Sequence, residues 1–183
     1  MSSTLLNPYI MAAAGCANDT ASGAQGGTGG SGWGLSGTSF PLGLGTSLLA
    51  GHALVGQTLN SISLFMQLTG SSGSVDMAAY HWAGSNHTYG SERAKSNIVT
   101  TTAMQSATSG GHVEFKWTFA TPATVVAGDY ISVDIPSSTG SGTNYTTEGS
   151  AFETNCKAQE YRGGWTQKTF GLRFTAEYNC PEP

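Results

Sequence analysis

Charged side chains are scarce in this sequence. The 183 residues include 7 Lys and Arg and 11 Asp and Glu, or 10% in total, whereas about a quarter is typical of soluble proteins. The cations are also scattered: the densest stretch is SERAKSN (Ser91–Asn97), in which Glu92 offsets Arg93 and Lys95. A surface that binds nucleic acid needs clustered cations to meet the phosphate backbone. We therefore expect no nucleic acid partner.

Long apolar runs are missing as well. No stretch approaches the ~18 consecutive apolar residues that mark a membrane-spanning helix, so we expect no membrane partner. The apolar stretch at the N-terminus has no preceding Lys or Arg and is interrupted by Asn7 and Pro8. Both features disfavour a secretory signal.

Cysteine is rare, with only 3 residues, namely Cys16, Cys156 and Cys180. An odd and small number does not suit a disulfide framework. The sequence leaves open whether Cys156 and Cys180 pair, and buried free thiols are the simpler interpretation.

Glycine, by contrast, is abundant, with 26 residues, and it is densest in SGAQGGTGGSGWGLSGTSFPLGLG. Bulky apolar side chains interrupt these glycines: Trp33, Leu35, Phe40 and Leu42. A free linker has no use for such groups, whereas an arm that lies along a surface needs anchoring points. We therefore interpret residues 1–50 as an extended Gly-rich N-terminal arm, bound to its own body or to a neighbour, and residues 51–183 as a β-sandwich domain. A flexible linker is the alternative.

Apolar and polar residues alternate in four segments, 60–70, 113–119, 131–135 and 170–178. This period predicts antiparallel strands with one buried and one solvated face. The predicted core includes Phe115, Trp117, Ile131, Val133, Leu172 and Phe174. Turn signals recur about every eight to fifteen residues, and no segment has a convincing helical period. The sequence thus predicts an all-β fold, an antiparallel β-sandwich of jelly-roll-like type.

The segment from Gln57 to Tyr145 resembles β-sandwich modules of bacteriophage virion proteins and bacterial surface proteins. The resemblance rests on LNSISLFMQLTGSSGSVDMAAY, on a Ser- and Thr-rich span, and on VEFKWTFATPATVVAGDYISVDI with its Pro-containing crossing and Ala-Gly-Asp-Tyr corner. It covers about half of the chain. It implies a jelly-roll-like sandwich used for attachment or binding, without a shared catalytic residue set.

Few residues suggest chemistry. The histidines His52, His81, His87 and His112 lack a standard metal spacing, and we expect them to donate and accept hydrogen bonds at surfaces or sheet edges. The many serines make any Ser-His-Asp match uninformative. We therefore expect no enzyme, no cofactor and no metal. No candidate buried ion pair is apparent, so stability is expected to be nearly flat between about pH 5 and 9.

Aromatic residues at strand ends or in loops are the remaining candidates for a binding site: Trp82, Tyr89, Tyr145 and Trp165. Such rings can form a platform on which a sugar stacks. The alternative is that they cap the sandwich or face a neighbouring subunit.

These observations favour a structural virion protein of a bacteriophage, and above all a capsid decoration or cement protein. Its partners would be the major capsid protein or other virion subunits, and a homo-oligomer, with a trimer favoured, would suit the local symmetry of a capsid. It would be assembled in the host cytoplasm and located in the virion. A carbohydrate-binding receptor module of a tail fibre or spike is the alternative.

Overall fold

The computed structural model describes residues 19–23, 32–37, 42–71, 76–84, 91–100, 113–135, 143–150, 156–162, 165–167, 171–172 and 174–179. Within these residues the chain is all-β and has no helix. Every strand runs antiparallel to the strands with which it pairs. The prediction of an antiparallel all-β fold is confirmed.

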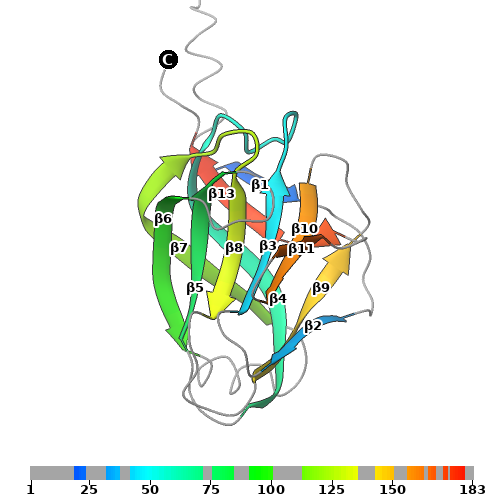
Figure 1. Cartoon of the computed structure of the whole chain (residues 1–183). Helices are drawn as coiled ribbons and strands as arrows, with labels where there is room; N and C mark the ends of the chain where they lie inside the picture. The colour runs from blue at the N-terminus through cyan, green and yellow to red at the C-terminus, as the bar shows by residue number, and fades with distance from the viewer. Residues whose placement is uncertain are drawn as a thin grey trace, which may run out of the picture.

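Seven strands form one curled sheet, a half-barrel (Figure 1). In their order across the sheet they are β13 (Phe174–Asn179), β4 (Thr58–Ser71), β7 (Val113–Thr124), β6 (Ser91–Thr100), β5 (Asp76–Ala83), β8 (Tyr130–Ile135) and β3 (Leu42–Leu48). At each end of this order the paired strands are far apart in the sequence. β13 pairs with β4 at one end, and β3 pairs with β8 at the other.

Six further strands lie at the edges of this half-barrel and are described by their backbone pairing. β1 (Asp19–Gly23) pairs with β13. Beyond β3 follow β10 (Cys156–Arg162) and β11 (Trp165–Gln167). The far half of β4 pairs with β9 (Thr143–Ser150), which also pairs with β2 (Gly32–Gly37) and β12 (Gly171–Leu172).

The sheet bends sharply between β6 and β7. These strands share a single bridge, Ser96 opposite Phe119, where other neighbours share long ladders. A side chain replaces part of the missing ladder, because the Thr118 N–H donates to Asn97 Oδ1 at 2.7 Å. The bend therefore keeps its backbone donor satisfied.

The core lies inside the curl, and the two ends of the sheet face each other across it. A small internal gap is lined from both sides, by Leu44 of β3 and Val133 of β8 and by Leu64 of β4 and Phe174 of β13. The fully buried large side chains are Trp117, Tyr130, Leu44, Leu48, Leu54, Leu59, Leu64, Met66 and Met77. The half-barrel thus has a packed apolar interior.

The alternation in the sequence predicted most of this core. Trp117, Ile131, Val133 and Phe174 are buried, as expected. Phe115 is only partly buried, and it packs against the core beside Trp117 at a ring-centroid distance of 6.4 Å. The side chain of Leu172 lies outside the described residues.

The extended arm predicted over residues 1–50 is not confirmed, and the last described part of this segment is a strand inside the sheet. β3, which contains Leu42, pairs with β8 on one side and with β10 on the other. Its residues Leu44 and Leu48 are fully buried. The physical reason is that LGLGTSL alternates leucine with glycine or polar residues, so one face of an extended strand carries the leucines. The glycines that suggested freedom lie on the other face.

The corner between β7 and β8 is held against the end of β3. Gly128 has a φ of 94°, which a glycine adopts without strain, and its N–H donates to Leu48 O at 2.7 Å. In return the Leu48 N–H donates to Asp129 O at 2.9 Å. The Gly-Asp corner predicted before the strand at Tyr130 is confirmed, and it sets the position of the Asp129 carboxylate.

Candidate functional site

A buried charged cluster lies at this corner, where β5, β6 and the β7–β8 connection meet. His81 Nε2 lies 2.8 Å from Asp129 Oδ2, and the two side chains are 0% and 3% exposed. Arg93 Nε lies 3.0 Å from the same oxygen, and the Val126 N–H donates to it at 2.8 Å. One carboxylate oxygen therefore accepts hydrogen bonds from His81 and Val126 and forms an ion pair with Arg93, so three elements meet at it.

The surroundings of Asp129 favour its ionised form. Burial alone would raise its pKa, but the hydrogen bonds from His81 and from the Val126 N–H, with the attraction of His81 and Arg93, outweigh burial and lower it. Because an ionised carboxylate can only accept, His81 Nε2 carries the proton in this bond. The cluster is thus a buried carboxylate compensated by an imidazole and a guanidinium.

This arrangement corrects two expectations. His81 is not a surface or sheet-edge residue, since its pairing with Ile131 on β8 places it in the middle of the sheet. An ion pair with a buried carboxylate also exists, between Asp129 and Arg93, whose side chain is 35% exposed, although the sequence showed none. No local pattern marks the cluster, because His81 and Asp129 are 48 positions apart.

The geometry of His81 does not offer a usable catalytic base. Its Nδ1 atom is buried without a hydrogen-bond partner, so one imidazole nitrogen is bound to a carboxylate and the other is unoccupied, as in part of a catalytic triad. A catalytic base must, however, reach its substrate, and the side chain is fully enclosed. The cluster fixes the corner between β7 and β8 against β5 and β6 instead.

Two aromatic rings stack on the opposite face of β5. Tyr80 and Trp82 lie 4.9 Å apart between ring centroids with an interplanar angle of 13°. Trp82 Nε1–H donates to Ser132 Oγ of β8 at 3.0 Å, and Lys95 Nζ lies 5.3 Å from the Tyr80 centroid. Tyr80 itself is only 7% exposed. The rings pack chiefly on each other.

The predicted glycan-binding residues are not brought together as described side chains. Trp82 is half-buried in the pair just described. Tyr145 and Trp165 belong to β9 and β11, where only the backbone is described, and Tyr89 lies outside the described residues.

The predicted anchors of the arm also have no described side chains. Trp33 and Leu35 lie in β2, with Leu35 opposite Tyr145 of β9. Phe40 lies outside the described residues, and Leu42 begins β3.

A polar groove crosses the outer face of β13, β4 and β7, and the sequence analysis did not find it. We call it the outer-face groove; it has a volume of about 450 Å³ and is lined by Ser61, Ser63, Glu114, Lys116, Thr175 and Glu177. The outward direction of Glu114 and Lys116 followed from alternation, and their exposure confirms it. The side chains that lie next to them in the groove could not be predicted from the sequence, because the register of β13 and β7 against β4 cannot be inferred from local pattern.

Two parallel side-chain bridges cross β4 in this groove. Lys116 of β7 pairs with Glu177 Oε2 of β13, and Ser61 Oγ donates to the same oxygen at 2.9 Å. One step along, Thr175 Oγ1 donates to Glu114 Oε1 at 3.3 Å. The hydrogen bonds from Lys116 and then Ser61 lower the pKa of Glu177. Both carboxylates are therefore held in position above a floor of small hydroxyl side chains.

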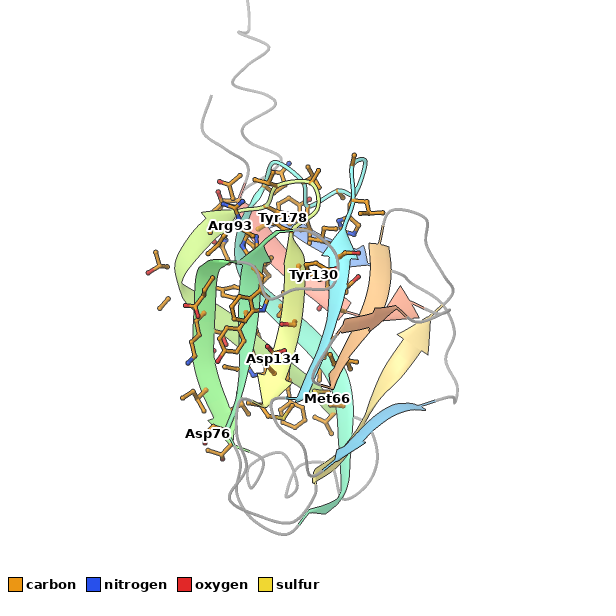
Figure 2. The ribbon with its side chains drawn as sticks, in the orientation of Figure 1. Met66, Asp76, Arg93, Tyr130, Asp134 and Tyr178 are labelled. Carbon is orange, nitrogen blue, oxygen red and sulfur yellow. The ribbon has the colours of Figure 1, made fainter. Side chains whose placement is uncertain are left out.

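Figure 2 shows side chains at the two ends of the half-barrel. Arg93 and Tyr130 lie near one end of the sheet, and Met66 and Asp76 lie toward the other. Asp134 lies between these ends on β8 (Figure 2) and is only 2% exposed.

Comparison with known proteins gives no match to a family model, to a curated protein or to a solved structure. Within the described ranges, no group of three or more His, Cys, Asp or Glu side chains is arranged to hold a metal ion. No helix long and apolar enough for a membrane span occurs in the part of the chain that the structure describes.

Proposed function

We propose that this chain is a structural protein of a bacteriophage virion, and specifically a capsid decoration protein. In this proposal the half-barrel is one part of a jelly-roll-like sandwich, and its partners are the major capsid protein or other virion subunits. The observation that carries the proposal is the use of the Gly-rich N-terminal segment as strands at sheet edges. β1 pairs with β13, and β2 pairs with β9.

Strand addition of this kind suits an assembly protein for a physical reason. Backbone hydrogen bonds hold such a strand without demanding particular side chains, so a glycine-rich segment can serve. Pairing also satisfies the exposed donors and acceptors of the edge strand, which are otherwise open to uncontrolled association. A chain that adds strands to its own edges can add them to the edge of a neighbouring subunit by the same geometry.

The body of the protein fits the same role. A sheet with few charges and a core of large apolar side chains is a compact unit that repeats well on a particle surface. Weak contacts suffice there, because many copies engage at once and each binding event raises the effective concentration for the next. A trimer would place one copy on each subunit around a local three-fold axis.

Cryo-electron microscopy of the source particle tests this proposal. We expect density for the chain on the capsid, with the N-terminal segment in contact with neighbouring subunits. Density confined to the tail would overturn the capsid assignment, and absence from the purified particle would overturn the virion role altogether.

A further inference from the structure

The outer-face groove combines features that a small polar ligand needs, and none of them is used by the buried cluster or by the aromatic pair. Its floor consists of Ser61 and Ser63, which are 2% and 7% exposed. Its walls carry Lys116 and Glu177, whose side chains are 47% and 42% exposed. The volume of about 450 Å³ lies within the range of ligand sites in proteins.

Each of the two carboxylates in the groove has one oxygen outside the side-chain bridges, which can accept further hydrogen bonds. Glu177 uses Oε2 for both of its bonds, from Lys116 and Ser61, and Glu114 uses Oε1 for its bond from Thr175. One oxygen of each carboxylate takes no part in these bridges. Because the bridges already fix both side chains, a ligand that binds these oxygens loses little additional conformational entropy.

The charges and donors of the groove select among ligand classes. Two carboxylates against one ammonium group disfavour an anion. A metal ion would need three or more converging ligands, and the described residues form no such group. All six lining residues carry polar groups, which an apolar ligand would cover without pairing them. An uncharged molecule with many hydroxyl groups satisfies every one of these conditions, since its hydroxyls both donate and accept.

We propose that the outer-face groove binds a neutral glycan chain. Sugar hydroxyls donate to Glu114 Oε2 and Glu177 Oε1, and such charge-assisted bonds are the strong ones. Lys116 Nζ and the Ser63 hydroxyl donate to sugar oxygens. Carbohydrate binding, which the sequence suggested for Trp82, is thus assigned to different strands on the same outer side of the sheet, β13, β4 and β7. The inference does not depend on the role in a virion.

A titration followed by nuclear magnetic resonance tests the proposal on the full chain. The probes are maltohexaose, cellohexaose and chitohexaose, each added to millimolar concentration. We expect at least one of them to shift the backbone amide signals of Ser63, Lys116 and Thr175. Glu114→Gln should weaken that binding about tenfold, because it removes a hydrogen bond to a charged group.

Controls separate binding from folding. Glu114 is exposed and makes only the bond from Thr175, so Glu114→Gln should keep the native spectrum elsewhere. Glu92→Gln changes an exposed acid on β6 and should leave the affinity unchanged. No shift with any of the three probes would overturn the proposal. So would shifts confined to Tyr80 and Trp82, or an equal loss of affinity in both variants.

Discussion

Asp129 accepts from His81 Nε2 at 2.8 Å through the same oxygen that the Arg93 guanidinium and the Val126 N–H contact. Removing a carboxylate and an imidazole from water is costly unless each finds a partner. Here the partners come from β5, from β6 and from the corner itself, so the cluster joins three segments that are distant in the sequence. Stability at low pH should depend on it.

The first prediction concerns acid. The folded-state pKa of Asp129 is lowered, so its contribution is complete above its unfolded value of about 3.9 and disappears as the pH falls through the folded value. Asp129→Asn should reduce the free energy of unfolding by about 1.5–3 kcal/mol at neutral pH. The difference from the wild type should shrink below about pH 4.

Urea unfolding at a series of pH values measures this difference. Asp76→Asn is the matched control, because Asp76 is exposed at the start of β5 and should show no comparable change. A difference between wild type and Asp129→Asn that stays constant down to the acid limit would contradict the assigned role. The expected flat stability between about pH 5 and 9 stays a prediction, although Asp129 and Arg93 form an ion pair with a buried carboxylate that the sequence did not indicate.

The second prediction concerns Gly45, which lies opposite Ser132 where β3 meets β8. A Cβ atom at Gly45 would lie 2.5 Å from Ile131 O and 2.7 Å from Ser132 Cβ. Since the carbonyl belongs to the backbone of a buried strand, it cannot move aside cheaply. Gly45→Ala should therefore cost about 1–3 kcal/mol, the usual range for overpacking.

Chemical denaturation of two glycine variants checks this reason. Gly56 has a φ of 89°, and a Cβ atom at this position would meet no other atom within 4 Å. Asparagine tolerates a positive φ better than other side chains, so the backbone strain of Gly56→Asn should cost less than the clash of Gly45→Ala. If both variants lose the same stability, or if Gly45→Ala loses none, close packing of β3 on β8 is not the cause.

The sequence predicted those parts of the fold that depend on local pattern. Alternation alone identified Trp117 on β7 and Val133 on β8 as core residues, because a period of two assigns a whole strand face at once. It did not identify β3 as a core strand, because the glycines at alternate positions suggested an extended arm lying along the protein's own surface or a neighbour's. Glycine is ambiguous, since it suits both a flexible segment and a strand against which another backbone packs closely.

The candidate sites could not be predicted in the same way. His81 and Asp129 meet only after β5 and β8 pair, and Glu114 meets Thr175 only through the register of two strands on β4. Pairing registers are set by the whole sheet and by its turns. Single positions such as Trp82 can be identified as aromatic from the sequence, but whether a ring is open to a ligand or covered by a neighbouring ring depends on packing.

The third prediction concerns Trp117. Its side chain is fully buried, and Nε1 lies 3.4 Å from Met77 O across the core. Trp117→Ala should cost about 3–5 kcal/mol, the usual range for truncation of a buried large aromatic. Thermal melting measures the loss, and Ile98→Ala is the control because Ile98 is 53% exposed. A Trp117→Ala melting temperature within a few degrees of the wild type would contradict the assigned core face.

The last prediction separates the N-terminal strands from the body. β3 lies between β8 and β10, and its buried Leu44 and Leu48 would each cost about 2–5 kcal/mol on truncation to alanine. A chain that begins at Gly51 lacks this strand and also the bond from Gly128 to Leu48. It should therefore fail to fold, whereas the sequence alone predicted a separate domain over residues 51–183.

A chain that begins at Leu42 is the matched comparison. It keeps β3 and loses β1 and β2, which pair only at sheet edges. It should retain a cooperative thermal transition, and under the proposed function it should lose attachment to the particle, because the strands that would reach a neighbour are gone. Circular dichroism and binding to particles lacking the protein measure the two effects. A cooperative transition in the chain from Gly51, close to that of the full chain, would show that β3 is dispensable. Full occupancy of particles by the chain from Leu42 would remove the N-terminal strands from the attachment mechanism.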